Sequence, residues 1–448
     1  MKKFTFKRQL LFVMLMLLGC LSIQAADDGL ITNQVVINLE EPGTLPQKIS
    51  ASDKYRITNL KVKGDINGTD LGFLREMAGQ SINGEDETDG KLSTLDLSDT
   101  KIVGGGEPYF NYGGYETYFT EYNKIGKYAF CSCNNLKRLT LPKDITSIEQ
   151  SAFFGCSGLT SITIPSSVTA IGKWSFYDCS SLTSIELPNS TTTIDEAAFA
   201  LCSDLTSVDL PSSITNIGDY VFFYCEKLSN VNLPSDITTI STGAFGGCSS
   251  LQNINLPSGV TTIGDNAFSD CSNLTNVILP SAFTAIGNVA FSGCSNLANV
   301  TLSSNITSIG TYAFQNCINL KNLTISKDVT SIKDIAFNNS YDDLELESVY
   351  VAWENPIEAG SFFNRIKISN CTLYVPQGTK EAYANADVWK DFGNIIEYDA
   401  TGIDKVINRS DVKEISRYSL NGQRVTSPTK GVNIVVYSDG SIKKVAVQ

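Results

Sequence analysis

Cysteine is the residue type whose spacing most suggests chemistry in this chain. Nine cysteines follow one another at intervals of 23 residues: Cys133, Cys156, Cys179, Cys202, Cys225, Cys248, Cys271, Cys294 and Cys317. Metal sites gather their ligands in closely spaced pairs, and only Cys131-Ser132-Cys133 comes near such a pair. The even interval instead predicts one buried cysteine in each turn of a repeated fold, where it acts as a small hydrophobe. Disulfides between neighbouring turns are the alternative. The chain after residue 26 holds eleven cysteines, an odd number, so at least one stays unpaired within a monomer.

The remaining residue types argue against catalysis. The chain has no histidine, which excludes Ser-His-Asp and Cys-His nucleophiles and histidine-based zinc sites. A carboxylate-based hydrolase would need two acids facing each other across a cleft, and the chain offers scattered ones such as Glu186 and Asp209. The stretch Asp65–Asp70 superficially resembles a calcium loop, but the EF-hand spacing is absent and we expect a plain turn. The sequence therefore predicts no enzyme, no cofactor and no metal site.

Charge and hydropathy restrict the partners. The formal net charge is -13, a field that repels phosphate backbones and anionic membrane surfaces, so we expect no nucleic-acid partner. Hydrophobic residues make up 42% and charged residues 18% of the chain, which indicates a folded protein.

The N-terminus has the pattern of an export signal. A basic stretch at Lys2–Arg8 precedes an apolar run at Leu10–Leu18, about half of what a spanning helix needs. We predict a signal peptide at residues 1–26 with cleavage near Ala25 or Ala26. Alternatively, Leu17-Leu18-Gly19-Cys20 has the shape of a lipobox, which would put a lipid anchor on its cysteine. No later stretch is apolar enough to form a transmembrane segment, so we expect an exported protein at the cell surface or outside the cell.

A 23-residue repeat is the main signal in the chain. Nine copies align on leucines at this interval, from Leu136 to Leu320, which we number position 1 of each copy. Position 4 is aliphatic, position 6 Leu or Ile, position 7 usually Pro, position 11 always Thr, position 13 always Ile and position 18 always Phe. Leu-x-x-Ile-x-Leu predicts a short strand with one apolar face, and proline ends it. Thr and Ile at positions 11 and 13 predict a second short strand, and residues 173–179 fit about one helical turn that closes the coil.

A single copy could not fold alone. Burying its five or six large apolar side chains contributes roughly 2 kcal/mol each, whereas ordering its backbone costs about 1–2 kcal/mol per residue. Stacking removes the deficit by burying a continuous core. We therefore predict an α/β, β-rich solenoid of about eleven coils, about 50 Å long at about 4.8 Å per coil.

The ends of the array require caps. We assign residues 27–91 to an N-terminal cap, residues 92–345 to the solenoid and residues 346–400 to a C-terminal cap, in which Ala382–Trp389 fits a short helix. Residues 401–448 form a separate small β module with an Asn-Gly turn. A tyrosine-rich insertion at residues 104–123 interrupts the first coil, and insertions in solenoids often form the binding face.

The motifs resemble those of a known family. Leu-Thr-x-Ile-x-Leu-Pro, Ile-Gly-x-x-Ala-Phe and Cys-Ser, over residues 92–340, are similar to the BspA-like leucine-rich repeats of Bacteroidetes surface proteins. The resemblance implies a right-handed leucine-rich-repeat solenoid, cell-surface adhesion to host matrix proteins or other microbes, and no catalytic residues. The tail, with Thr401-Gly402-Ile403 and Asn421–Val425, resembles the C-terminal sorting modules of type IX secretion.

Aromatic side chains are the candidate ligand-binding residues. They lie in the insertion and at repeat positions 16, 19 and 20, which the coil itself leaves free to vary: Tyr109, Phe110, Tyr112, Tyr115, Tyr118, Phe119, Phe154, Trp174, Tyr177, Tyr220, Phe223 and Tyr224. Clustered exposed aromatics mark interaction sites. Alternatively, the insertion folds back and buries them in a local core. Positions 2, 3 and 5, mostly Thr, Ser, Asn and Gln, face outward from the first strand and either bind sugars or serve only as a soluble surface.

These observations favour an adhesin-type binding protein with an extracellular protein or glycan ligand. A glycan-binding accessory protein for polysaccharide capture and a structural surface spacer without a ligand are the alternatives. The sequence does not specify the oligomeric state.

Overall fold

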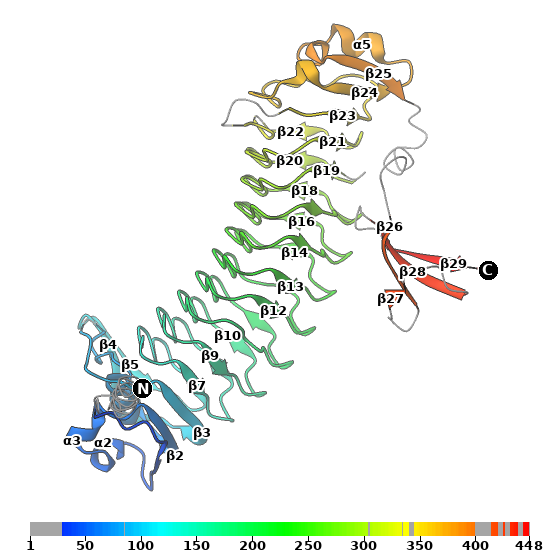
Figure 1. Cartoon of the computed structure of the whole chain (residues 1–448). Coiled ribbons are helices and arrows are strands. Elements are labelled where there is room, and N and C mark those ends of the chain that lie inside the picture. Colours follow the sequence, from blue (N-terminus) through cyan, green and yellow to red (C-terminus); the bar gives the residue numbers. More distant parts are fainter. Residues whose placement is uncertain are drawn as a thin grey trace, which may run out of the picture.

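The computed structural model shows an elongated, gently curved solenoid with a cap at each end (Figure 1). It describes residues 29–84, 86–302, 305–333, 335–339, 345–398, 414–419, 424–425, 431–437 and 442–447. The predicted signal peptide and the possible lipid anchor at Cys20 lie outside the described residues. None of the helices in this part of the chain is long and apolar enough to cross a bilayer.

The first strands of the coils form a row along the solenoid, which hydrogen bonding divides into four parallel sheets. We call this row the first sheet. Where neighbouring coils pair, their partners are 23 residues apart, as Arg138 is from Ser161 and Asn299 from Asn322. Consecutive strands are 23 residues apart, so the apolar positions 1, 4 and 6 recur at the same depth. The strands of this first sheet are β3 (Thr94–Ile102), β7 (Arg138–Thr140), β9 (Ser161–Thr163), β12 (Ser207–Asp209), β13 (Asn230–Asn232), β15 (Asn253–Ile254), β17 (Asn276–Val277), β19 (Asn299–Leu302) and β21 (Asn322–Ile325).

A second row of parallel strands is built from positions 12 and 13, as the Thr-x-Ile pattern predicts. It is divided into two sheets, and we call the row the second sheet. The threonine at position 11 donates its hydroxyl to the carbonyl of the threonine one coil earlier, as Thr169 does to Thr146 at 3.2 Å. This contact links the same position of neighbouring coils and gives the invariant threonine a structural role. The strands are β6 (Lys124–Ile125), β8 (Ser147–Ile148), β10 (Ala170–Ile171), β11 (Thr193–Ile194), β14 (Thr239–Ile240), β16 (Thr262–Ile263), β18 (Ala285–Ile286), β20 (Ser308–Ile309) and β22 (Ser331–Ile332).

The segment that closes each coil is a series of turns, and the helical turn predicted for residues 173–179 is wrong. Alternate amides donate to the following coil: Trp174 to the carbonyl of Glu196 at 3.0 Å, and Phe176 to that of Ala198 at 2.8 Å. Trp174 and Asp178, at positions 16 and 20, have φ of 53° and 56°. Left-handed residues interrupt a helix, so the backbone bonds to its neighbouring coil instead. We call positions 15–20 the turn segment and the surface it forms the turn face.

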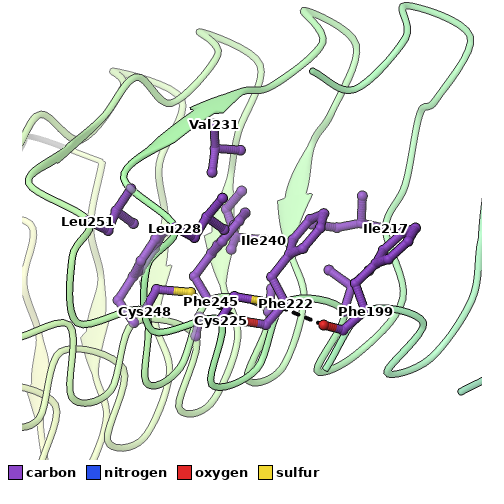
Figure 2. Packing of buried hydrophobic residues seen from close by; sticks show 14 of the residues in the cluster. Phe199, Ile217, Phe222, Cys225, Leu228, Val231, Ile240, Phe245, Cys248 and Leu251 are labelled. Atoms are coloured by element: carbon purple, nitrogen blue, oxygen red, sulfur yellow. Dashed lines mark hydrogen bonds between the residues drawn. The ribbon is translucent and has the colours of Figure 1, made fainter. Parts of the chain in front are cut away.

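Stacked rings and thiols fill the core beside the turn segments (Figure 2). The position-18 phenylalanines form a continuous column from Phe130 to Phe337, with neighbouring centroids 5.1–5.7 Å apart. From Cys156 to Cys317, the cysteine of each coil donates its thiol to the carbonyl of the phenylalanine one coil earlier, as Cys225 does to Phe199 at 3.2 Å. All cysteines of the described residues are free thiols, which confirms the buried cysteine ladder.

The N-terminal cap continues the first sheet with β1 (Val35–Asn38) and β2 (Asn59–Ile66), and adds α2 (Leu45–Lys48), α3 (Ala51–Lys54) and α4 (Gly68–Met77). The plain turn predicted at Asp65–Asp70 is wrong, because it contains the start of α4. Asn67 and Asp70 form a capping box there, and the buried Asp70 carboxylate also accepts the amide of Leu45 at 2.9 Å. That carboxylate satisfies amides of the helix start and of the preceding loop.

The C-terminal cap closes the other end with β23 (Ser348–Val351), β24 (Thr372–Pro376) and β25 (Asn394–Tyr398), which extend the first sheet. The helix predicted for Ala382–Trp389 is shorter and earlier: α5 covers Lys380–Asn385. The 3₁₀ turns η1 (Ile368–Asn370) and η2 (Trp389–Asp391) flank it. Val388, with φ of 71°, separates α5 from η2. Trp389, fully buried, lies 5.9 Å from the Phe363 ring, which packs against the last ring of the phenylalanine column.

Beyond residue 398 the structure describes only four strands, which form an antiparallel sheet in the order β27-β26-β28-β29. They are β26 (Glu414–Ser419), β27 (Arg424–Val425), β28 (Gly431–Tyr437) and β29 (Ile442–Val447). The Asn-Gly turn predicted between the first two strands lies outside the described residues. A sorting role for residues 401–448 remains a proposal.

The thiol ladder makes a testable prediction about reactivity. Burial raises the pKa of the Cys133 and Cys317 thiols to about 12, so they stay protonated and unreactive at pH 8. We expect the native protein to react rapidly with a disulfide reagent at no more than one thiol, the partly exposed Cys131. The same unreduced protein should react at all eleven cysteines after unfolding. Fewer than three reactive thiols in the unfolded protein would contradict the free ladder.

A defect in one coil makes a second prediction. Ser175 is fully buried at position 17, and its hydroxyl has no hydrogen-bond partner among the described residues. Alanine occupies this position in eight other coils. We expect Ser175→Ala to raise the free energy of unfolding by about 1 kcal/mol, because it removes an unpaired polar group. The reverse change Ala198→Ser, one coil later, should lower it in the same denaturation experiment. Equal stabilities of all three proteins would show that Ser175 finds a partner.

Candidate functional site

The tyrosine-rich insertion forms a β-hairpin beside the first coil. Its strands are β4 (Gly105–Tyr112) and β5 (Glu116–Thr120), joined by a turn through Gly113 and Gly114. Phe110 pairs with Tyr118 across the hairpin. The two rings lie 6.1 Å apart, and both approach the ring of Tyr128, at 5.3 and 5.2 Å. Tyr128 occupies position 16 of the first coil, so this cluster fixes the hairpin to the start of the turn face.

Part of the predicted ligand surface is therefore buried. Tyr109 and Phe110 are 1% and 2% exposed, and the Phe110 ring covers the guanidinium of Arg75 at 4.6 Å. Burial raises the pKa of the Tyr109 hydroxyl well above its usual value. For these two residues the structure favours the local core that the sequence left as an alternative. The side chain of Tyr112 lies outside the described residues.

The buried hairpin residues replace hydrogen bonds that the first coil lacks. In later coils the carbonyls at positions 15 and 17 accept amides from the preceding coil, as Lys173 and Ser175 do. The first coil has no such neighbour. The Tyr109 hydroxyl donates to the position-15 carbonyl of Lys127 at 2.8 Å, and Arg75 donates to the position-17 carbonyl of Ala129 at 3.1 Å. Two side chains thus satisfy carbonyls that would otherwise be buried without donors.

Other aromatic side chains of the insertion face solvent. Tyr115, at the hairpin tip, is 90% exposed, Tyr122 is 70% exposed and Phe119 is 51% exposed. Tyr118 is half-buried, and its hydroxyl donates to the Glu116 carboxylate. We call Tyr115, Phe119 and Tyr122 the hairpin aromatics. They are the most exposed rings in the described part of the chain, and no contact with another described ring is present for any of them.

The aromatics at positions 16, 19 and 20 lie along the turn face. We call these six residues the turn-face aromatics: Phe154, Trp174, Tyr177, Tyr220, Phe223 and Tyr224. Phe154 and Tyr224 are 36% and 39% exposed, and the other four are half-buried. Phe154 and Tyr177 stack at 4.9 Å between neighbouring coils. The surface therefore combines exposed ring edges with substantial self-packing.

Small residues in the following coil explain how these rings pack. A Cβ atom built on Gly243 would meet the ring of Tyr220 at 2.2 Å, one on Gly246 would meet Phe223 at 3.0 Å, and one on Gly247 would meet Tyr224 at 2.8 Å. Each ring thus leans onto a glycine one coil later. Phe223 also lies 4.6 Å from Tyr224, edge to face. Each of the three rings is thus fixed in place on one side while its outer part stays accessible.

Carboxylates accompany the turn-face aromatics, a feature that our sequence analysis missed. Asp178 follows Tyr177, Asp219 precedes Tyr220, and Glu196 lies in the coil between them. Burial raises the pKa of Asp178, whose carboxylate has no hydrogen bond or ion pair within the described residues. Glu196 pairs with Lys173 at 3.1 Å. The signal was visible in the sequence, because residues 144–320 contain thirteen acidic residues and only two lysines.

The outer face of the first sheet is a second polar surface. Position 3 carries asparagine in five consecutive coils: Asn230, Asn253, Asn276, Asn299 and Asn322. The last two are joined by a hydrogen bond of 2.9 Å, and all except Asn322 are exposed. In the C-terminal cap, the rings of Tyr350 and Tyr374 stack at 4.2 Å on the same face.

The acids considered for catalysis lie on this outer face. Glu186 and Asp209 are exposed at position 5 of neighbouring coils, and Asp209 accepts a hydrogen bond from the Asn232 amide. Their position on one sheet face differs from the opposed arrangement that a carboxylate hydrolase requires. Within the described residues, no group of three or more acids and cysteines could hold a metal ion.

A family model with the description BspA type leucine rich repeat region matches residues 123–241 and 215–343, with six copies in the family match. Among curated proteins none matches the chain.

Several solved structures are similar to this chain. A leucine-rich repeat protein from Bacteroides ovatus ATCC 8483 is 26% identical over 60% of this chain and 70% of its own, with a TM-score of 0.49. The leucine rich repeat protein of T. pallidum is 30% identical over 40% and 72%, with a TM-score of 0.31. A leucine rich cell surface protein from Faecalibacterium prausnitzii A2-165 is 26% identical over 67% and 86%, with a TM-score of 0.35.

The role of the Tyr109 hydroxyl can be tested by removing one atom. We expect Tyr109→Phe to lower the free energy of unfolding by about 1 kcal/mol, because the Lys127 carbonyl loses its buried donor. The matched change Tyr115→Phe should have no effect, since that side chain is almost fully exposed. Chemical denaturation of both variants measures the difference. An unchanged Tyr109→Phe protein would show that the first coil does not need this donor.

Proposed function

Because the repeats at residues 123–343 belong to the BspA-type leucine-rich-repeat family, we propose that this protein is a non-catalytic binding protein of the cell surface or the extracellular space. Its role in this proposal is adhesion to host matrix proteins or to other cells. The neighbour from Faecalibacterium prausnitzii is described as a cell surface protein, which agrees with an exported location. The predicted signal peptide supports the same location.

The observation that carries the proposal is the exposure of the hairpin aromatics. Tyr115, Phe119 and Tyr122 offer large rings to solvent on a hairpin whose other side is anchored in the core. Exposed rings on a rigid support lose little conformational entropy on binding, and aromatic residues dominate protein interfaces. The buried half of the hairpin thus positions the exposed half for a partner.

Glycan binding is the second candidate, and the outer face of the first sheet favours it. Amide groups of Asn230, Asn253, Asn276 and Asn299 recur once per coil, and neighbouring coils lie about as far apart as parallel strands do. Amides both donate and accept hydrogen bonds, as sugar hydroxyls require. The coils that carry Asn276 and Asn299 are neutral, since residues 271–320 contain no charged side chain. An uncharged polysaccharide lying along the solenoid fits this surface.

A binding screen with substituted proteins tests the proposal. The purified chain is applied to immobilised extracellular matrix proteins and to a glycan array, beside the triple variant Tyr115→Ser, Phe119→Ser, Tyr122→Ser. We expect a protein ligand whose affinity falls at least tenfold in the variant. Substitution is preferable to deleting the hairpin, because deletion would remove the core residues Tyr109 and Phe110.

A matched control removes exposed apolar side chains elsewhere. Val36→Ser with Ile318→Ser replaces two side chains, each 46% exposed, and should leave protein binding unchanged. A glycan signal lost in Asn253→Ala with Asn276→Ala, but retained in the hairpin variant, would replace adhesion to proteins with the second candidate. Absence of any ligand would favour a structural surface spacer.

A further inference from the structure

We propose that the turn face between Phe154 and Tyr224 binds a cationic polypeptide segment, one rich in lysine or arginine. This inference rests on the proposed function and specifies the chemistry of the partner. The surface combines the turn-face aromatics with the carboxylates of Asp178, Glu196 and Asp219, and we call it the acidic aromatic strip.

Charge gives the first argument. Residues 144–320 hold thirteen of the acidic side chains of the chain and only the lysines 173 and 227. Both lysines are already paired, Lys173 with Glu196 at 3.1 Å and Lys227 with Asp204 at 2.6 Å. The uncompensated carboxylates therefore attract cations to the middle of the solenoid and repel anions.

The second argument is the state of Asp178. This carboxylate is partly buried beside Tyr177, and within the described residues it has neither an ion pair nor a hydrogen bond. Loss of water disfavours its charged form and raises its pKa. An incoming ammonium or guanidinium group would supply the missing counter-charge.

The third argument is the arrangement of the rings. Position 19 of three successive coils carries Tyr177, Ala200 and Phe223. Ala200 is 1% exposed, so a small buried residue separates the two rings. Lysine and arginine bind the faces of aromatic rings while their alkyl stems cover apolar surface. Aromatic and acidic groups within one strip thus bind both parts of such a side chain.

The length of the strip limits its ligand. Phe154 to Phe223 spans three coil steps, about 16 Å at the spacing of the phenylalanine column, and an extended chain covers this distance with about five residues at about 3.3 Å each. We therefore expect a short basic segment to saturate the strip.

The test uses fluorescently labelled octalysine as the probe and the full chain as the receptor. We expect binding at low ionic strength that weakens as salt is added, and no binding of octaglutamate. The variant Asp178→Asn, Glu196→Gln, Asp219→Asn should bind octalysine at least tenfold more weakly. Tyr177→Ala with Tyr224→Ala should weaken it about fivefold, with circular dichroism confirming that each variant is folded.

A matched control separates a site from a general effect of net charge. Glu186→Gln, Asp209→Asn, Asp236→Asn removes the same number of charges from exposed positions outside the strip. We expect less than a twofold change in octalysine affinity. Equal weakening by the two triple variants, or no binding by the parent protein, would overturn the inference. If octalysine does not bind while a ligand from the screen still depends on the hairpin aromatics, the inference of a cationic partner is wrong and the proposed function stands.

Discussion

The hydrogen bonds that join each turn segment to the following coil are the constraint on which the structure depends. Alternate amides of a turn segment point along the solenoid, as those of Trp174 and Phe176 do, and only a neighbouring coil can accept them. Buried backbone groups without partners are costly, so an end of the array must supply side chains in place of a coil. Arg75 and Tyr109 do this at the N-terminus. The buried half of the hairpin therefore has a structural role in the solenoid, and only its outer half is available to a partner.

The same bonds arrange the surface. Because every coil repeats its neighbour's backbone, side chains at one position form a row at the spacing of the coils. A large ring can then lie over a small residue of the next coil, as Tyr220 does over Gly243, or stack on a ring there, as Phe154 does on Tyr177. The turn-face aromatics are thus neither fully buried nor fully exposed. Their inner atoms stabilise the stacking of coils, while their outer atoms and the neighbouring carboxylates face solvent.

The repeat and both sheets could be predicted from the sequence, because the apolar spacing admits few other structures. The turn segment could not, since apolar residues at Trp174, Phe176 and Tyr177 fit a helical turn as well as a series of turns. Helix α4 lacks a strong apolar period, and two glycines lie in its first half. Predicting that Tyr109 is buried and Tyr115 exposed requires the register of the hairpin, because both are tyrosines in one polar stretch. The pairing of Arg75 with carbonyls 53 and 54 residues away leaves no local signal.

The thiol ladder makes the chain vulnerable to wrong disulfide formation before it folds. The unfolded chain after residue 26 exposes eleven cysteines, any two of which an oxidant can join wrongly. Once folded, the repeat thiols from Cys156 to Cys317 are occupied as donors within the core, as Cys225 is. Maturation thus needs no oxidase or isomerase. Rapid folding, which buries the thiols, is instead what prevents wrong disulfides from forming. The chain is suited to compartments of either redox poise, provided that it reaches its coiled state before an oxidant reaches it.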